Sequence, residues 1–103
     1  MFGEGYKPCG DAPNTLAVVE CTEAKTKAWD QRLNAAYATL QRAADPAQRE
    51  PLRKAQRLWV QYRDANCAFY AAGEGTIHRI EAAECLRAMT ADRAEELEAA
   101  ARP

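Results

Sequence analysis

The sequence predicts an all-α protein, a three-helix, up-down-up antiparallel bundle stapled by two disulfides. In three long segments, apolar residues recur every three or four positions, which is the period of a helix with one buried face. The connections between these segments are short, so neighbouring helices should run antiparallel. The chain also has four cysteines in 103 residues, without the close CxxC spacing of a zinc site or a redox motif. Paired structural disulfides are therefore expected.

Composition limits the classes of function. The formal net charge of -1 gives no support to a nucleic-acid partner, and the longest apolar run is too short for a membrane span. Disulfides indicate an oxidising compartment, which means the periplasm or the outside of the cell. Residues 1–10 lack the basic start and apolar stretch of a signal peptide. We therefore expect the given chain to be the mature part of an exported protein, with Met1 supplied for expression.

Residues 1–13 read as an irregular lead-in, because they hold three of the five glycines and two of the five prolines. Cys9 should tether this segment. Residues 14–103 are expected to form one helical domain. Asn14 can cap a first helix that reaches about Ala43 or Ala44. Its inward stripe is Leu16, Val19, Thr22, Thr26, Trp29, Leu33, Tyr37 and Leu40.

The second helix should run from about Ala47 to Tyr70, with Asp45 as its cap and Pro46 at its first position. Pro51 falls inside this range, so either the regular helix begins late, near Glu50, or the proline kinks it. We favour the late start. We also expect this helix to be the central one, covered by the other two. Its apolar face comprises Leu52, Ala55, Leu58, Trp59, Tyr62 and Ala65.

The segment 71–76, AAGEGT, predicts a turn in which Thr76 caps a third helix, from about Ile77 to Ala100. Thr90 could be a second cap that breaks this helix in two, and the sequence does not decide. The expected inward stripe is Ile80, Ala83, Leu86 or Cys85, Met89, Arg93 and Leu97.

Bundle geometry allows more than one disulfide connectivity, because Cys21, Cys67 and Cys85 should all lie toward one end. We favour pairing Cys9 with Cys21 and Cys67 with Cys85, since each bridge then closes a short loop. Each disulfide could add about 3 kcal/mol to the free energy of unfolding by restricting the unfolded chain.

Polar residues should also meet inside the bundle. Counting from the turns places Asp30 across from Arg63, and both Tyr37 and Arg93 near Gln56. Such groups are costly to bury unless they are paired, so we expect shared hydrogen bonds. A catalytic site is one interpretation, but a cluster that fixes the register of the helices is favoured. The predicted structural polar cluster is Asp30, Asn34, Tyr37, Gln56, Arg63, Asp64 and Arg93.

Three runs carry a resemblance to a known family: ECTEAKTKAWDQRLNAAYATL, AQRLWVQYRDANCAF and GTIHRIEAAECLRAMTADRAEEL. They resemble the bacterial family named for the lysozyme inhibitor LprI, over nearly the whole chain after residue 8. The loop GEGT departs from the GGT or GGS common in that family. The resemblance implies a small exported helical protein and the inhibition of lysozyme. Matching positions are Cys9, Cys21, Asp30, Leu33, Asn34, Tyr37, Gln56, Trp59, Arg63, Asp64, Cys67, Gly75, Cys85, Thr90, Arg93 and Leu97.

A lysozyme inhibitor needs a rigid protrusion and preferably an acidic surround, because animal-type lysozymes are basic and hold two carboxyl groups in a cleft. From Gly73 to the end the chain has seven acidic residues and four arginines. We therefore expect the loop between Ala71 and His78, held by Cys67 and Cys85, to contact the enzyme. Its polar tips are Glu74, Thr76 and His78.

The alternative function is a periplasmic binding or immunity-type module for another envelope protein. An enzyme is not expected, because no motif supplies a nucleophile, a base and an oxyanion site together. His78 is the only histidine, so a histidine metal cluster is not expected either, and neither is any cofactor. The sequence names neither the lysozyme type nor the oligomeric state.

Overall fold

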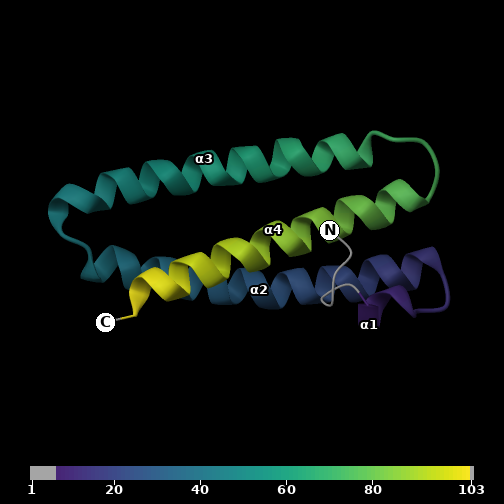
Figure 1. Ribbon diagram of the computed structural model, residues 1–103, viewed down its shortest axis with the longest axis horizontal. Helices are drawn as coiled ribbons and strands as arrows, with labels where there is room; N and C mark the ends of the chain where they lie inside the picture. The colour runs from purple at the N-terminus through teal and green to yellow at the C-terminus, as the bar shows by residue number, and fades with distance from the viewer. Residues whose placement is uncertain (1–6, 103) are drawn as a thin grey trace.

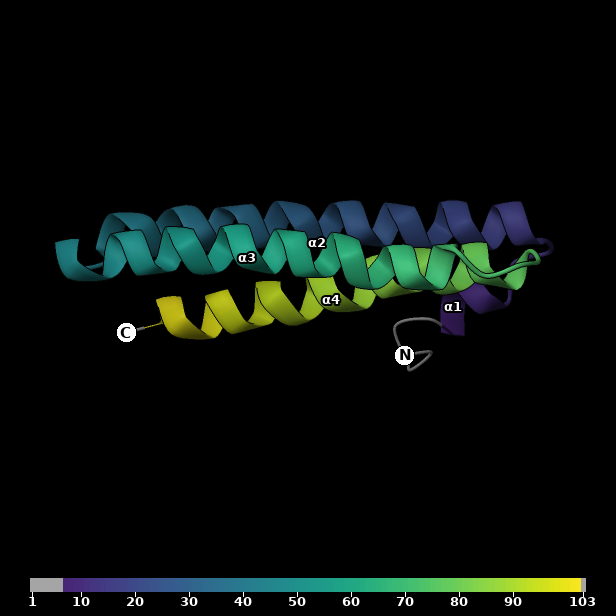
Figure 2. The same ribbon diagram turned by 90° about the horizontal axis from the view of Figure 1, so that it is seen from above.

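The computed structural model describes residues 7–102 as four helices joined by short connections. They are α1 (Lys7–Gly10), α2 (Thr15–Ala43), α3 (Pro46–Ala71) and α4 (Ile77–Ala101). The three long helices run up, down and up, as predicted, and form a rod of about 48 × 24 × 17 Å (Figures 1 and 2). Both predicted disulfides are confirmed.

The lead-in is not irregular throughout, because Lys7–Gly10 forms one helical turn. Residues 1–6 lie outside the described part of the chain. The Cys9–Cys21 disulfide, with 5.4 Å between the Cα atoms, ties this turn to α2. The helix α2 begins where the sequence predicted, since the Oδ1 atom of Asn14 accepts a hydrogen bond of 2.8 Å from the backbone N–H of Ala17.

The predicted late start of α3 is wrong, because the helix begins at Pro46 and continues through Pro51. A proline at the first helical position is already in helical geometry. Pro51 lies in the second turn, where its missing N–H deprives only the carbonyl of Ala47 of an intrahelical partner. Ala47 is exposed, so water can replace that bond. Asp45 occupies the cap position without a side-chain hydrogen bond.

The central helix is α4, not α3 as the sequence predicted. α4 packs against both α2 and α3 and buries eight residues, whereas Cys67 is the one buried residue of α3. Leu58 and Tyr62, expected in the core, are 53% and 62% exposed. The alanines of α4 explain the difference, because small side chains such as Ala83 and Ala94 permit close approach. The core cluster is Leu33, Ala36, Ala94 and Leu97, with Trp29, Tyr37, Leu40, Leu52 and Trp59 packed against it.

Thr90 does not break the third long helix, which is continuous from Ile77 to Ala101. The Thr90 side chain is fully buried, and its hydroxyl has no hydrogen-bond partner among the described residues. Thr76 also does not cap α4 with its side chain. The chain reverses instead at Gly75, whose φ of 93° lies in the left-handed region that favours glycine.

Candidate binding surface at the tip loop

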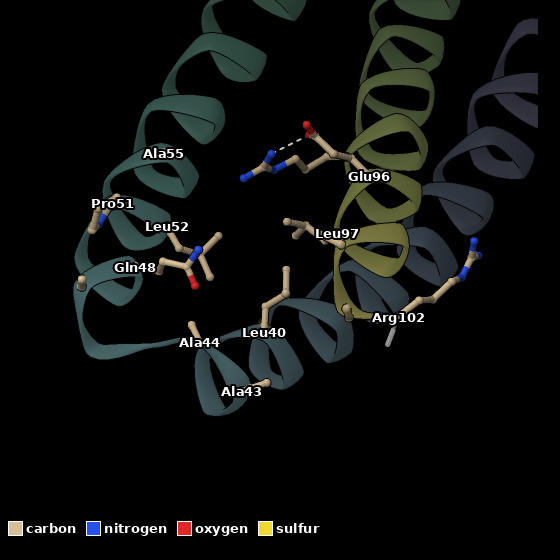
Figure 3. A pocket seen from close by; sticks show the side chains of 14 residues that line it. Leu40, Ala43, Ala44, Gln48, Pro51, Leu52, Ala55, Glu96, Leu97 and Arg102 are labelled. Atoms are coloured by element: carbon tan, nitrogen blue, oxygen red, sulfur yellow. Dashed lines mark hydrogen bonds and ion pairs between the residues drawn. The ribbon is translucent and has the colours of Figure 1, made fainter.

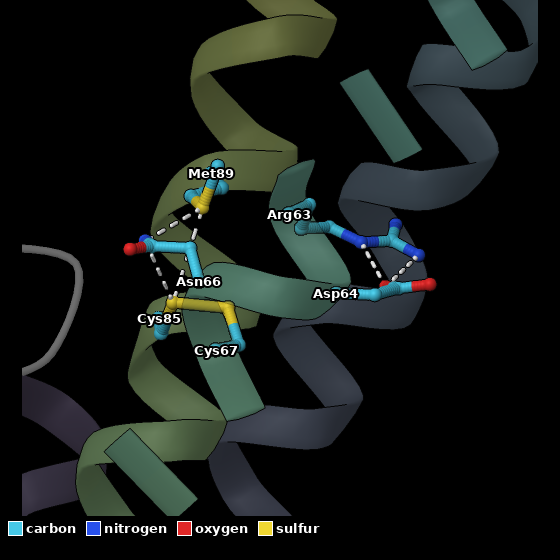
Figure 4. The surroundings of a disulfide bond; sticks show 6 residues. All are labelled: Arg63, Asp64, Asn66, Cys67, Cys85 and Met89. Atoms are coloured by element: carbon cyan, nitrogen blue, oxygen red, sulfur yellow. Dashed lines mark hydrogen bonds and ion pairs between the residues drawn. A yellow bond between two sulfur atoms is a disulfide. The ribbon is translucent and has the colours of Figure 1, made fainter. Parts of the chain in front are cut away.

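The tip loop, residues 71–78, connects α3 to α4 at the end of the rod that also carries α1 (Figure 1). The Cys67–Cys85 disulfide joins these two helices just behind the loop, with 5.5 Å between the Cα atoms. Beside it, the Nδ2 atom of Asn66 lies 3.6 Å from the Cys85 sulfur and 3.3 Å from the Met89 sulfur (Figure 4). The helices therefore cannot separate at the base of the loop.

The two glycines of the loop have different physical roles. Gly75 supplies the positive φ that turns the chain into α4. Gly73 supplies space, because a Cβ atom at residue 73 would overlap the imidazole ring of His78. The His78 Nδ1 atom also lies 3.0 Å from the Oε1 atom of Glu81, one helical turn further on. The imidazole is thus held between the Gly73 backbone and the Glu81 carboxylate.

The predicted contact residues are partly brought together by this geometry. Glu74 and Thr76 are exposed, whereas His78 is half-buried. Thr76 and His78 line a shallow depression of about 300 Å³, which Arg79 also lines. Glu74 does not line this depression, although it belongs to the same loop. The loop therefore presents hydroxyl, imidazole and guanidinium groups around one small hollow, with a separate carboxylate nearby.

The expected acidic surround needs correction, because Glu84 is fully buried and adds no surface charge. The Nε atom of Arg87 donates to both carboxylate oxygens of Glu84, at 2.8 and 3.0 Å, and the Nη2 atom of Arg87 also donates to Oε1 of Glu84. These bonds raise the pKa of Arg87 above its usual value, against the opposing effect of burial. This pair was not predicted from the sequence, although its spacing of three residues on a helix was an available signal.

Other acidic side chains of α4 are also neutralised by neighbours. Glu96 pairs with Arg93 at 2.6 Å, and Glu98 receives two hydrogen bonds from Arg32 of α2, at 2.7 and 3.0 Å. Hydrogen bonding to Arg32 lowers the pKa of the Glu98 carboxyl. Glu98 is therefore not only a solvated surface carboxylate, because its bonds to Arg32 bridge α4 to α2.

The predicted polar cluster is divided into separate groups, so its members do not all share hydrogen bonds. Gln56 accepts a bond of 3.0 Å from the Nε atom of Arg93, as expected from their proximity. Arg63 turns to Asp64 of its own helix, at 2.9 and 3.0 Å (Figure 4), and not to Asp30. The remaining bonds lie within α2, from Asn34 to Asp30 at 3.4 Å and from Gln41 to the Tyr37 hydroxyl at 2.9 Å.

The separation of α2 from α3 explains why a single network does not form. Open grooves border the two helices, and Asp30 and Arg63 both line the one that α4 also borders. Asn34, Tyr37 and Gln56 line another. The guanidinium of Arg63 instead lies 5.0 Å from the ring centre of Trp59, a cation–π distance. These residues hold local structure and do not converge on one reacting point.

The fold defines a class: a small, disulfide-stabilised helical-bundle protein of the extracytoplasmic, oxidising compartments. Within residues 7–102, no helix combines the length and the apolar character needed to cross a membrane. The chain belongs to the lysozyme inhibitor LprI family, whose sequence model matches residues 7–97, from α1 to the last turns of α4. This match confirms the resemblance found in the sequence. No curated protein and no solved structure matches the chain.

Proposed function

We propose that this protein inhibits lysozyme by direct contact, without catalysis, in the periplasm or outside the cell. The observation that carries the proposal is the family match, which spans all three long helices and all four cysteines. An inhibitor that acts by contact needs a preformed surface, because ordering a flexible segment on binding costs affinity. A disulfide-bonded helical rod meets that requirement.

The tip loop is the proposed contact surface. It lies at one end of a rod whose shorter dimensions are 24 and 17 Å, so it can approach a cleft end-on. Glu74 is available to pair with the basic rim of an animal-type lysozyme. His78 and Arg79 provide donors for the two carboxyl groups inside such a cleft. The clamp at Cys67–Cys85 and the contact of His78 with Gly73 keep these groups in place before binding.

Cell-wall lysis assays with animal lysozymes and bacterial muramidases test the activity. We expect the purified oxidised protein to slow lysis by at least one animal lysozyme in a dose-dependent way. If it slows none of these enzymes and binds none of them in a titration, the inhibitor proposal is wrong. The protein would then be better described as a binding or immunity-type module for another envelope protein.

Substitutions in the tip loop test the contact surface separately. The combined variant Glu74→Gln and His78→Ala should weaken inhibition at least about tenfold, the effect of removing one strong interfacial contact. Glu95→Gln is the matched control, because this carboxylate is also exposed but lies on α4 away from the loop. Full potency in the loop variant would reject the loop while leaving the inhibitory activity intact.

A further inference from the structure

An apolar stripe that has no partner among residues 7–102 runs along the outer side of α3. Its members are Ala55, Leu58, Tyr62, Ala65 and Phe69, at alternating intervals of three and four residues. All five are exposed, and the three large ones are 53%, 62% and 73% exposed for Leu58, Tyr62 and Phe69. Alternating intervals of three and four are the seam by which two helices pair along their length. The stripe therefore has the pattern of a helix-pairing surface, over roughly 21 Å.

The stripe is distinct from the face by which α3 holds its own bundle. That inner face includes Trp59, packed on the core cluster, Asn66 beside Met89, and the buried Cys67. The helix α3 thus has two apolar faces, and the described part of the chain covers only the inner one. Exposed large apolar residues that line up on one face indicate an interaction surface, whereas scattered ones do not.

We propose that the stripe binds the same stripe of a second copy, with the two α3 helices antiparallel. Charge favours this direction. Residues 46–60 carry four cationic side chains and one acidic, whereas residues 61–76 carry one cationic and two acidic. A parallel pair would set the cationic half of each helix against the cationic half of the other, which is repulsive. An antiparallel pair places this cationic half against the less basic half of the other helix.

The stripe is also complementary to itself in shape when the helices run antiparallel. In the register centred between Arg63 and Asp64, Tyr62 faces the partner's Ala65, a large side chain against a small one. Leu58 faces the partner's Phe69 in the next layer. The first of these layers lets the two helices interdigitate, because it sets a large side chain against a small one, and the second brings two large apolar side chains into contact.

The surface area that the two copies would bury limits the strength of the dimer. Covering Tyr62 and Phe69 would remove roughly 250 Å² per copy from water, since an aromatic side chain presents about 150 to 250 Å². A standard interface buries about 800 Å² per partner. With Leu58, the alanines and the aliphatic stem of Lys54, the contact lies at the small end of specific interfaces. The dimer should therefore be reversible and depend on concentration.

Sedimentation of the oxidised protein between about 5 and 500 µM tests the proposal, a range suited to a small interface. We expect the wild type to shift from monomer toward dimer. The combined variant Leu58→Gln and Tyr62→Gln should dissociate at least about tenfold more readily. Leu16→Gln is the control, because Leu16 is 67% exposed but lies on α2. If circular dichroism shows that the double variant has lost helix, Phe69→Gln alone takes its place.

A spin label at Arg57→Cys distinguishes the two directions of pairing. The antiparallel register separates the two labels by about 20 Å along the pair, whereas a parallel pair brings them side by side. A wild type that stays monomeric throughout, a dimer that the stripe variants do not weaken, or labels side by side would each overturn the proposal. These outcomes are independent of lysozyme inhibition, which is measured in the lysis assay.

Discussion

The two ends of the rod are held together by different kinds of interaction. One end carries α1, both disulfides and the tip loop, and the buried pair of Glu84 and Arg87 lies in the same half. The other end, where α2 passes into α3 and α4 finishes, has an open cleft of about 760 Å³. Leu40, Leu52 and Leu97 point into this cleft from the three helices (Figure 3). We call these the clamped end and the open end.

The comparison shows where stability is concentrated. The clamped end is held by covalent bonds and a buried ion pair, whereas the open end depends on apolar packing that is incomplete. Local opening starts where buried contacts are fewest, so the open end should open first. The proposed contact surface lies at the end that opens last, which suits a binding loop that must keep its shape.

The largest effect should come from the buried ion pair. Glu84→Ala leaves the guanidinium of Arg87 buried without its partner, which should lower the free energy of unfolding by about 3 to 5 kcal/mol. Urea denaturation at pH 7 measures this loss, with Glu95→Ala as the exposed control. A loss no larger than that of the control would show that the pair does not stabilise the clamped end.

Removal of the disulfide behind the tip loop should have the next largest effect. Replacing Cys67 and Cys85 by serine should cost about 3 kcal/mol, because the unfolded chain regains the freedom of the loop between them. Amide hydrogen exchange in residues 71–78 should accelerate as well. Replacing Cys9 and Cys21 by serine should cost a similar amount without that acceleration. Equal exchange at the tip loop in both variants would contradict a local clamp.

A smaller effect is expected at the open end. Leu97→Ala should cost about 2 kcal/mol, at the low end for a buried leucine, because truncation would enlarge the open cleft that Leu97 lines and would leave no closed cavity. Leu33→Ala is the comparison, since Leu33 is also 2% exposed but does not line the cleft. Thermal unfolding of both variants measures the difference. A greater cost at Leu97 than at Leu33 would mean that the open end is better packed than the cleft suggests.

The smallest effect concerns the surface pair of Arg32 and Glu98. Its contribution to stability requires the ionised carboxylate, whose pKa Arg32 lowers from the ordinary value of 4.5. Stability from this pair is therefore present above pH 4.5 and is lost as the pH falls through the lowered pKa. Glu98→Gln should remove this pH dependence, which parallel denaturation series across the acid range would detect. If the stability of Glu98→Gln kept the same pH dependence as the wild type, that dependence would come from other carboxyl groups.

Local chemistry made much of the fold predictable. Asn14 capped α2 as expected, and the glycine-containing segment 71–76 formed the expected turn, because caps and turns depend on neighbouring residues. Pairing Cys9 with Cys21 and Cys67 with Cys85 was also predictable from the short loops that result. The start of α3 could not be predicted. The cost of Pro51 within the helix depends on whether the carbonyl of Ala47, which loses its hydrogen-bond partner, faces water.

Choices between partners could not be predicted from periodicity. The α3 sequence offers two apolar faces, one through Leu58 and Tyr62 and one through Trp59 and Cys67, and the bundle uses the second. A count of acidic residues likewise cannot distinguish the buried Glu84 from the exposed Glu74. The separation of Asp30 from Arg63 could not be predicted from periodicity either. It depends on how α4 packs against both α2 and α3.

The disulfide connectivity has a consequence for biogenesis. Each bridge joins cysteines that follow one another along the chain, with separations of 12 and 18 residues. A polypeptide that crosses a membrane amino end first presents its thiols in that same order. An oxidant that links each newly arrived thiol to the one before it would thus produce the native pairing directly, and no isomerase would be needed to correct it.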